Sequence, residues 1–209
     1  MASALIIYGA GGHAAVVADA VRAGMDWTVA GFLDDDSLRT GEAYYGATII
    51  GTRHDIVKLG IGRWIFGFGN CDRRRAAALD LPAATVVHPS AIVSPSATLE
   101  PGVFIGPGAI VNARAHLESH VIVNSGAIVE HDCRIGVASH ICPGVRLAGN
   151  VRIGAAVWIG IGSTIRETIT IGDNACLGAG SVVVHNIDAQ AVAYGVPARV
   201  VRTRTALGS

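Results

Sequence analysis

The chain has 209 residues, carries no formal net charge at pH 7, and only 15% of its residues are charged. This balance gives no electrostatic basis for binding nucleic acid or an anionic membrane surface. The four cysteines have no CxxC spacing, which is typical of a reducing cytosol and not of a zinc site. No stretch has membrane-spanning length and the N-terminus lacks the basic flank of a signal peptide, so we expect a soluble cytoplasmic protein.

Residues 1–84 predict an α/β domain of the Rossmann type. An apolar strand, Leu5 to Tyr8, meets the glycine-rich turn GAGGHA, and a helix-like pattern then continues to Gly24. A second strand, Thr28 to Leu33, leads into three aspartates. Glycines between a strand and a helix let a phosphate approach backbone N–H groups at the helix N-terminus. The pattern therefore predicts a nucleotide-binding domain.

The rest of this domain is expected to contain a short strand at Thr48 to Ile50, a helix after Thr52, a strand at Trp64 to Phe68 and a helix at Asp72 to Leu79. Ligands of such sheets bind at the carboxyl ends of the strands. The candidate contacts at those ends are Gly11, Gly12, His13, Asp34, Asp35 and Asn70. The same residue types also serve as turn and capping residues, and that alternative stays open.

A six-residue repeat fills the chain from Ala91 to Asn186. The third residue of all sixteen hexads is Ile, Leu or Val. A period of six fits a parallel β-helix in which three hexads make one triangular coil, so residue n lies beneath residue n+18 at about 4.8 Å. We assign residues 85–209 to this all-β domain. The segment from Ile187 to Arg202 is expected to close its open end, where strand edges would otherwise be unpaired.

His131 is the strongest candidate for chemistry in the repeat. It falls at a corner, between Glu130 and Asp132, and the 18-residue rule puts Ala113 beneath it and Gly149 above it. Two small neighbours leave space around the ring. Imidazole is a good general base at neutral pH, and an adjacent carboxylate fixes its tautomer. The backbone N–H of Gly149 would suit a developing oxyanion. The plain alternative is a solvated surface histidine.

His140 occupies a different column of the repeat. Ile122 lies beneath it and Trp158 above it, a pattern that indicates a buried face. It is therefore either a packed residue or a ligand contact. His116 and His120 do not have the spacing of a metal-ligand set, and no third ligand completes one, so no metal is expected.

Several motifs together carry a family resemblance. The uninterrupted hexads, with HPSAIVSP before them and YGVPARVV after them, resemble the left-handed β-helix (hexapeptide-repeat) acyltransferases. The combination of YGAGGHA, FLDDD and FGFGN with VNSGAIVEHDCRIG is similar to the PglD/NeuD-like sugar acetyltransferases among them. This resemblance covers essentially the whole chain. It implies a left-handed parallel β-helix that follows the α/β domain.

The resemblance also implies roles for individual residues. The catalytic histidine falls on His131 and its acidic partner on Asp132, although many relatives carry Glu there, so Glu130 stays open as the orienting group. Asn124 is a candidate for positioning the acceptor. Acetyl-CoA contacts fall near His140, Gly149, Ile161 and Ala179. Nucleotide-sugar contacts fall near Gly11, Gly12, His13, Asp34 and Asp35. Family members are homotrimers with active sites between subunits.

The expected function is acetyl-CoA-dependent N-acetylation of a UDP- or GDP-linked 4-amino-4,6-dideoxysugar, with His131 as general base. The main alternative is O-acetylation of a free sugar of the sialic-acid type. A non-catalytic β-helix scaffold that binds a nucleotide, an NAD-dependent oxidoreductase and a zinc hydrase are further alternatives. The sequence does not distinguish uridine from guanosine.

Overall fold

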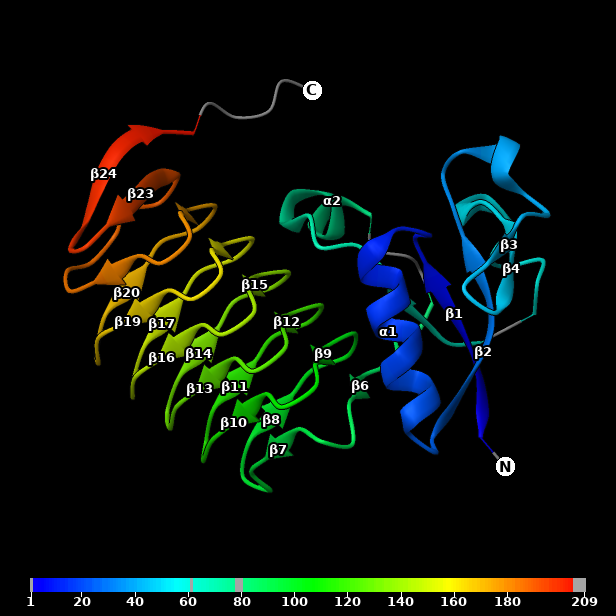
Figure 1. Ribbon diagram of the computed structural model, residues 1–209, viewed down its shortest axis with the longest axis horizontal. Helices are drawn as coiled ribbons and strands as arrows, with labels where there is room; N and C mark the ends of the chain where they lie inside the picture. Colours follow the sequence, from blue (N-terminus) through cyan, green and yellow to red (C-terminus); the bar gives the residue numbers. More distant parts are fainter. Residues whose placement is uncertain (1, 61, 78–80, 205–209) are drawn as a thin grey trace.

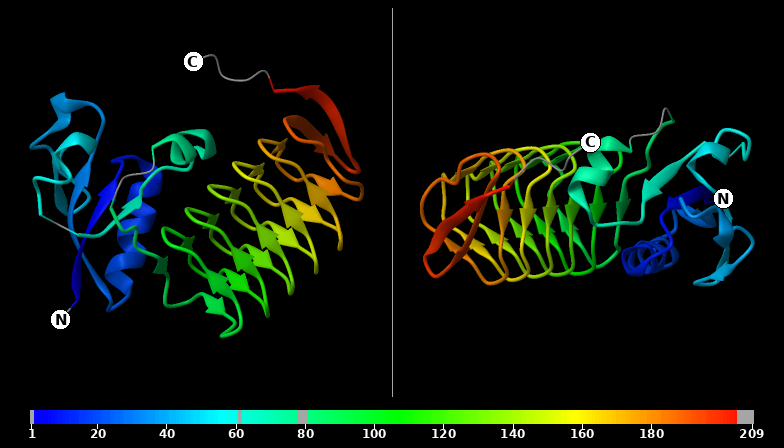
Figure 2. Two further views of the ribbon diagram at one scale, coloured as in Figure 1. Left: turned by 180° about the vertical axis from the view of Figure 1, so that it is seen from behind. Right: turned by 90° about the horizontal axis from the view of Figure 1, so that it is seen from above.

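The computed structural model describes residues 2–60, 62–77 and 81–204. Figure 1 shows an α/β domain beside a stack of coils made of short strands, and Figure 2 shows the same stack from two further directions. The chain thus combines an N-terminal α/β region with a parallel β-helix, and the predicted fold class is confirmed. None of the described helices is long and apolar enough to cross a membrane.

The N-terminal sheet has five strands in the order β3-β4-β2-β1-β5. Its elements are β1 (Ser3–Tyr8), α1 (Gly12–Ala23), β2 (Trp27–Leu33), η1 (Ser37–Arg39), β3 (Ala43–Tyr44), β4 (Ala47–Gly51), η2 (Arg53–Asp55), β5 (Trp64–Phe66) and α2 (Cys71–Ala76). β1 pairs in parallel with both β2 and β5, whereas β3 is antiparallel to β4. The carboxyl ends of β1, β2 and β5 therefore meet at one edge of the sheet, as the glycine turn and the aspartates predict.

Two predicted helices differ from the structure. The helix expected after Thr52 is only the single 3-10 turn η2, which a capping box between Thr52 and Asp55 begins. Gly60 then takes a positive φ of 66°, a conformation in which a helix does not continue. The helix expected from Asp72 begins one residue earlier, and its last α-helical residue is Ala76. Leu79, the predicted end, lies outside the described residues.

The β-helix consists of three parallel sheets. The first sheet faces the N-terminal domain and contains β6 (Val86–Val87), β9 (Phe104–Ile105), β12 (Ile122–Val123), β15 (His140–Ile141), β18 (Trp158–Ile159), β21 (Cys176–Leu177), β23 (Ala191–Gly195) and β24 (Ala198–Thr203). The second sheet contains β7 (Ile92–Val93), β10 (Ile110–Val111), β13 (Ile128–Val129), β16 (Arg146–Leu147), β19 (Thr164–Ile165) and β22 (Val182–Val183). The third sheet contains β8 (Thr98–Leu99), β11 (His116–Leu117), β14 (Arg134–Ile135), β17 (Arg152–Ile153) and β20 (Thr170–Ile171).

The ladder pairing obeys the 18-residue rule. Ile110 pairs with Ile128, and Arg134 pairs with Arg152. The third-position aliphatic residues of the inner coils are fully or almost fully buried and form one continuous core along the prism. First-position serines fit beside them because their hydroxyls bond to backbone, as Ser139 does to the Gly154 carbonyl at 2.7 Å. The period of six is therefore a packing constraint.

The C-terminal segment extends the first sheet. β23 pairs in parallel with β21, and β24 turns back antiparallel on β23. Arg204, just beyond β24, forms an ion pair with Asp72 of α2 at 2.5 Å. The hairpin thus covers the last edge of the first sheet and contacts the N-terminal domain.

The two parts of the chain share packing. Phe104 and Ile122 of the first sheet belong to the same apolar cluster as Leu5 of β1 and Val17 of α1. Arg74 of α2 is fully buried, and its guanidinium donates to the carbonyls of Phe68, His120, Ala138 and Ser139. The N-terminal domain is therefore held against the first sheet by both apolar and polar contacts.

Truncating a buried aliphatic side chain inside the prism should destabilise the protein. Ile171 is fully buried, and replacing it with alanine leaves a cavity between coils that cannot collapse. We expect Ile171→Ala to lower the free energy of unfolding by about 2–5 kcal/mol. Thr170→Ala, which changes the exposed neighbour on the same strand, is the control and should cost less than about 1 kcal/mol. Urea unfolding followed by circular dichroism measures both, and equal losses would contradict the inward assignment of the third position.

Candidate active site

Two corners of the prism flank the second sheet. We call the corner between the first and second sheets the groove corner; it consists of residues 124–126, 142–144, 160–162 and 178–180. We call the corner between the second and third sheets the histidine corner; it consists of residues 112–114, 130–132, 148–150 and 166–168. The predicted site residues of the β-helix fall on these two corners or beside them.

His131 lies exposed on the histidine corner with its ring oriented by Asp132. The Nδ1 atom is 2.7 Å from Oδ2 of Asp132, so Nδ1–H donates to the carboxylate and Nε2 is left free. Glu130 instead accepts from the backbone N–H of His131 at 3.4 Å, and no hydrogen bond joins its carboxylate to the ring among the described residues. The geometry therefore pairs the imidazole with Asp132.

Asp132 is itself held by Arg114, one coil below. The guanidinium donates from Nε to Oδ1 at 2.7 Å and from Nη2 to Oδ2 at 2.8 Å. The bonds from Arg114, with that from His131, hold the pKa of Asp132 well below its usual range, so the carboxylate stays charged. Asp132 also has a positive φ of 62°, which costs a non-glycine residue of order 1 kcal/mol. The equivalent corner residues Arg114, Asn150 and Thr168 share this conformation, so it is a property of the corner.

Gly149 lies directly above the ring of His131. A β-carbon at Gly149 would come within 2.6 Å of both Nε2 and Cε1 of His131, so any larger residue here would displace the imidazole from this position. Among the described residues, no backbone acceptor is bonded to the Gly149 N–H. An N–H next to a free imidazole nitrogen has the geometry of a group that could bind the oxygen of a carbonyl.

A cavity of about 580 Å³ lies between the N-terminal domain and the groove corner. Six of the residues that sequence reasoning proposed as ligand contacts line it: Gly12, His13, Asn124, His140, Ile161 and Ala179. His13 reaches it from the start of α1 and packs edge-on against Phe104 at 5.3 Å. Substrate contacts and acetyl-CoA contacts, proposed from separate parts of the chain, thus share one cavity.

A chain of hydrogen bonds fixes the polar wall of this cavity. Oδ1 of Asn124 accepts from the Ser125 N–H at 2.8 Å, so its Nδ2 faces Nε2 of His140 at 3.0 Å. The other ring nitrogen of His140 donates to the Gly69 carbonyl at 3.1 Å. His140 is therefore a buried neutral imidazole that orients the Asn124 amide, and its contact with a ligand is limited by its 4% exposure.

Three histidines near the interface between the two parts of the chain are neutral at physiological pH. Burial, with the nearby charge of Arg74, lowers the pKa of His13 to about 4 and that of His120 to about 4. The same two causes lower the pKa of His140 to about 3. Nε2 of His13 is buried without a hydrogen-bond partner among the described residues, so it is an available polar atom at the cavity wall.

A smaller cavity of about 240 Å³ lies at the carboxyl ends of β1 and β2, lined by Gly11, Asp34 and Asp35 among others. Asp34 is paired with Arg39 at 2.5 Å. Asp35 accepts from the Tyr8 hydroxyl at 2.7 Å and is paired with Arg73 at 3.1 Å. Both aspartates are thus held in place by cationic or hydroxyl partners at the edge of this cavity.

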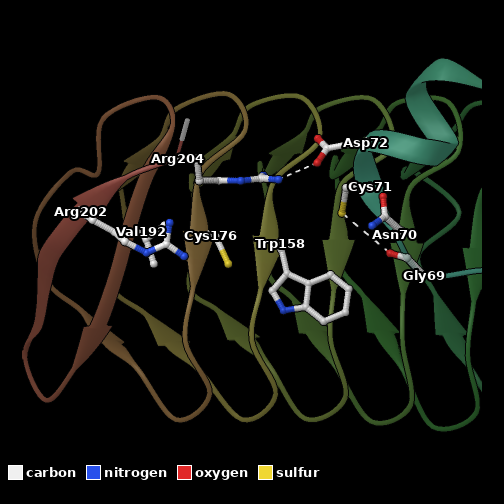
Figure 3. Close-up of a pocket in the computed structure, with 9 residues that line it drawn as sticks. All are labelled: Gly69, Asn70, Cys71, Asp72, Trp158, Cys176, Val192, Arg202 and Arg204. Carbon is white, nitrogen blue, oxygen red and sulfur yellow. Dashed lines mark hydrogen bonds and ion pairs between the residues drawn. The ribbon is translucent and has the colours of Figure 1, made fainter. Parts of the chain in front are cut away.

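Asn70 serves as a helix cap. Its side-chain oxygen accepts from the Arg73 N–H at 2.8 Å at the start of α2. It also lines a third cavity, of about 670 Å³, between α2 and the C-terminal hairpin (Figure 3). Trp158 and Cys176 line this cavity and the cavity at the groove corner, but no residue of the histidine corner reaches it.

Within the described residues, no three His, Cys, Asp or Glu side chains gather as metal ligands.

A single chain does not bring the two halves of the predicted site together. Asn124 and His131 lie on opposite corners of the second sheet, separated by strand β13 and the width of one prism face.

Sequence reasoning missed Arg114, although the 18-residue rule puts it directly beneath Asp132. It also missed Arg74, because nothing in the run of three arginines tells which one is buried.

Comparison with known proteins assigns both parts of the chain to families. Residues 4–81 match the PglD N-terminal domain, and residues 150–185 match the bacterial transferase hexapeptide family of six repeats. No curated protein sequence matches the chain significantly.

Solved structures cover almost the entire chain. PerB from Caulobacter crescentus, in complex with CoA and GDP-perosamine, is 34% identical, with 95% of this chain and 97% of that chain covered and a TM-score of 0.87. The acetyltransferase domain of PglB from Neisseria gonorrhoeae, in complex with acetyl coenzyme A, is 36% identical, with 96% and 100% covered and a TM-score of 0.89. WeeI from Acinetobacter baumannii shares the fold at 21% identity, with 95% and 100% covered and a TM-score of 0.81.

The chain belongs to the PglD/NeuD-like sugar acetyltransferases. Its β-helix is therefore the left-handed one of the hexapeptide-repeat family. GDP-perosamine N-acetyltransferase from Caulobacter crescentus is also similar in forms with one histidine replaced by asparagine or alanine.

This sugar acetyltransferase should lose stability in mild acid. Its unfolded chain binds protons on His13, His120 and His140 below about pH 6.5, whereas the native chain binds them only near pH 4 or 3. Between those values the unfolded state binds more protons, so stability falls as pH falls and these groups have no effect above pH 7. We expect the urea midpoint to fall between pH 6.5 and 4.

A single substitution measures how much His120 contributes to this dependence of stability on pH. His120→Leu should make that fall shallower, because the ring of His120 is stacked against Trp64 and its Nδ1 has no partner among the described residues. His54→Gln, at an exposed position, is the control and should leave the profile unchanged. A profile that is equally steep in both variants would show that His120 does not contribute.

Proposed function

We propose that this chain is an acetyl-CoA-dependent N-acetyltransferase that acts on the amino group of a nucleoside-diphosphate-linked 4-amino-4,6-dideoxysugar. The observation that carries the proposal is His131, with one ring nitrogen bonded to Asp132 and the other free beside Gly149. The identity of 34% over almost the full length with an enzyme that was solved with CoA and GDP-perosamine supports the substrate class.

His131 is assigned as the general base. Asp132 holds Nδ1–H, so Nε2 is the nitrogen that takes a proton from the attacking amine. The ion pair between Asp132 and Arg114 keeps the carboxylate charged, and the charged carboxylate stabilises the imidazolium that forms. A general base of this kind contributes typically about 10²–10⁴-fold to the rate.

The reaction is a direct transfer that balances without a metal or a redox partner. The lone pair of the amine attacks the thioester carbonyl, Nε2 of His131 takes one proton from the nitrogen, and the carbonyl oxygen becomes an oxyanion that the Gly149 N–H binds. When the C–S bond breaks, the electron pair stays on sulfur and the imidazolium returns the proton to the CoA thiolate. The products are the N-acetylated sugar and CoA.

The two cavities are assigned to the two substrates. The cavity at the groove corner, with Asn124, Ile161 and Ala179, is assigned to the acetyl and pantetheine portion of acetyl-CoA. The smaller cavity at the ends of β1 and β2, with Asp34 and Asp35, is assigned to the nucleoside. His13 and the glycine turn lie between these cavities and would face the sugar and its phosphates.

We also propose that the enzyme is a homotrimer. The second sheet is bounded by the groove corner on one side and by the histidine corner on the other. If three prisms turn this sheet toward a common axis, a threefold rotation brings the histidine corner of each chain to the groove corner of the next, and the ring closes. Each active site would then take His131 from one chain and the cavity from its neighbour.

The surface of the second sheet supports this arrangement. Its outward residues on the first three strands are Ile92, Ile110 and Ile128, and Ile92 is 64% exposed in the single chain. An isoleucine column on the outside of a prism is better explained by a subunit contact than by solvent.

The reaction is tested by release of thiol from acetyl-CoA. We expect CoA release with a GDP- or UDP-linked 4-amino-4,6-dideoxysugar, and none with free sialic acid or buffer. His131→Ala should lower kcat by about 10²–10⁴-fold and change the KM for acetyl-CoA little. His185→Ala, an exposed histidine three coils higher in the same column, is the matched control and should keep the activity. Release with sialic acid would overturn the substrate class, and full turnover by His131→Ala would overturn the role of the base.

The shared site is tested by mixing two inactive variants. His131→Ala removes the base, and Ile161→Glu places a charge at the exposed groove corner where acetyl-CoA would lie. Trimers reassembled from both chains should regain part of the activity, because some sites join an intact histidine corner to an intact groove corner. No recovery, with a trimer mass by light scattering, would mean that each chain contains a complete site.

A further inference from the structure

Two arginines lie side by side on the outer face of the third sheet. Arg134 on β14 and Arg152 on β17 are direct partners in the parallel ladder, and both side chains are exposed. Neighbouring strands lie about 4.8 Å apart, so the two guanidinium groups leave the sheet next to each other. Like charges directly opposite each other on neighbouring strands destabilise the sheet.

Neither arginine forms an ion pair within the described residues. No carboxylate lies within ion-pair distance of either guanidinium across residues 2–60, 62–77 and 81–204. Six acidic side chains at the two corners that flank the third sheet have other hydrogen-bond or ion-pair partners: Glu100, Glu118, Glu130, Asp132, Glu167 and Asp173. Within the described residues, the arginine pair therefore has no direct carboxylate partner.

The pair lies next to the reacting groups. Arg134 follows His131 by three residues in the same coil, and Arg152 follows Gly149 by three residues in the next coil. In the proposed trimer, the histidine corner of one chain meets the groove corner of its neighbour. The third sheet then forms the outer wall of the cleft and faces the N-terminal domain of that neighbour.

We propose that Arg134 and Arg152 bind the diphosphate of the nucleotide-linked sugar that is held by the N-terminal domain of the neighbouring chain. This inference rests on the proposed function. Guanidinium groups present paired N–H donors that match phosphate oxygens, and two of them stacked at strand spacing match two linked phosphates. The arginines bind and position the acceptor and take no part in proton transfer.

The chemistry of the two substrates favours the acceptor over acetyl-CoA. Both carry a diphosphate. In a nucleotide sugar the diphosphate is attached directly to the sugar, so it stays near the amine that reacts at His131. In acetyl-CoA the whole pantetheine arm separates the thioester from the diphosphate. Only the acceptor therefore places phosphates within a coil or two of His131, where Arg134 and Arg152 lie.

Calorimetric titration of the assembled protein with GDP and, separately, with CoA tests the assignment. The double variant Arg134→Gln and Arg152→Gln should bind GDP about tenfold or more weakly, since each charge-assisted hydrogen bond contributes more than a neutral one. CoA affinity should stay as in the unchanged protein. The dependence of GDP affinity on salt should also become shallower, because two cationic contacts are lost.

Control measurements distinguish a specific loss of GDP binding from a loss of trimer assembly and from a failure of the proposed function. Arg63→Gln removes an exposed arginine at the amino end of β5, on the opposite edge of the N-terminal sheet, and should leave both titrations unchanged. The double variant should keep the mass of the unchanged protein by light scattering. Unchanged GDP binding, or weaker CoA binding alone, would overturn the inference. Binding is measured without turnover, so absence of acetyl transfer would count against the proposed function only.

Discussion

The parallel pairing of each residue with the one eighteen positions later is the constraint on which the rest of this structure depends. It stacks the third-position aliphatic residues into one continuous core and makes each outward position part of a column. A column repeats one chemical environment at strand spacing. The position of His131 beneath Gly149 and the position of Asp132 above Arg114 are both consequences of that pairing.

The charged side chains of the site share partners. Asp132 is shared between Arg114 and His131, so one carboxylate both orients the imidazole and is itself fixed by a bidentate guanidinium. On the other side of the prism, buried Arg74 donates to carbonyls and to the Cys71 sulfur, and burial together with the charge of Arg74 keeps the neighbouring imidazoles neutral. The histidine that would react is exposed, whereas those that shape the cavity are buried.

The N-terminal domain completes the cavity by covering the first sheet. The Gly69 carbonyl, at the end of the segment that follows β5, accepts from His140 and so connects a loop of the α/β domain to Asn124 on the prism. Because Arg74 also bonds the neighbouring Phe68 carbonyl, that loop is held from two sides. The proposed nucleotide site on one domain and the groove on the other are thereby kept in a fixed relation, which transfer between two bound substrates requires.

The sequence alone determined the β-helix, its register and the neighbours of His131, because a strict period of six allows only one stacking of inward aliphatic residues. It also predicted the strand, glycine turn and helix at the N-terminus, since those signals are local. The buried state of Arg74 and the bond from His140 to Gly69 depend on how two domains meet, and no local pattern encodes that contact. The helix expected after Thr52 was wrong for a related reason: a capping box starts a turn, but packing and the following glycine decide its length. Only the tertiary structure showed that His131 and the cavity occupy opposite corners, because their separation is a property of the closed coil.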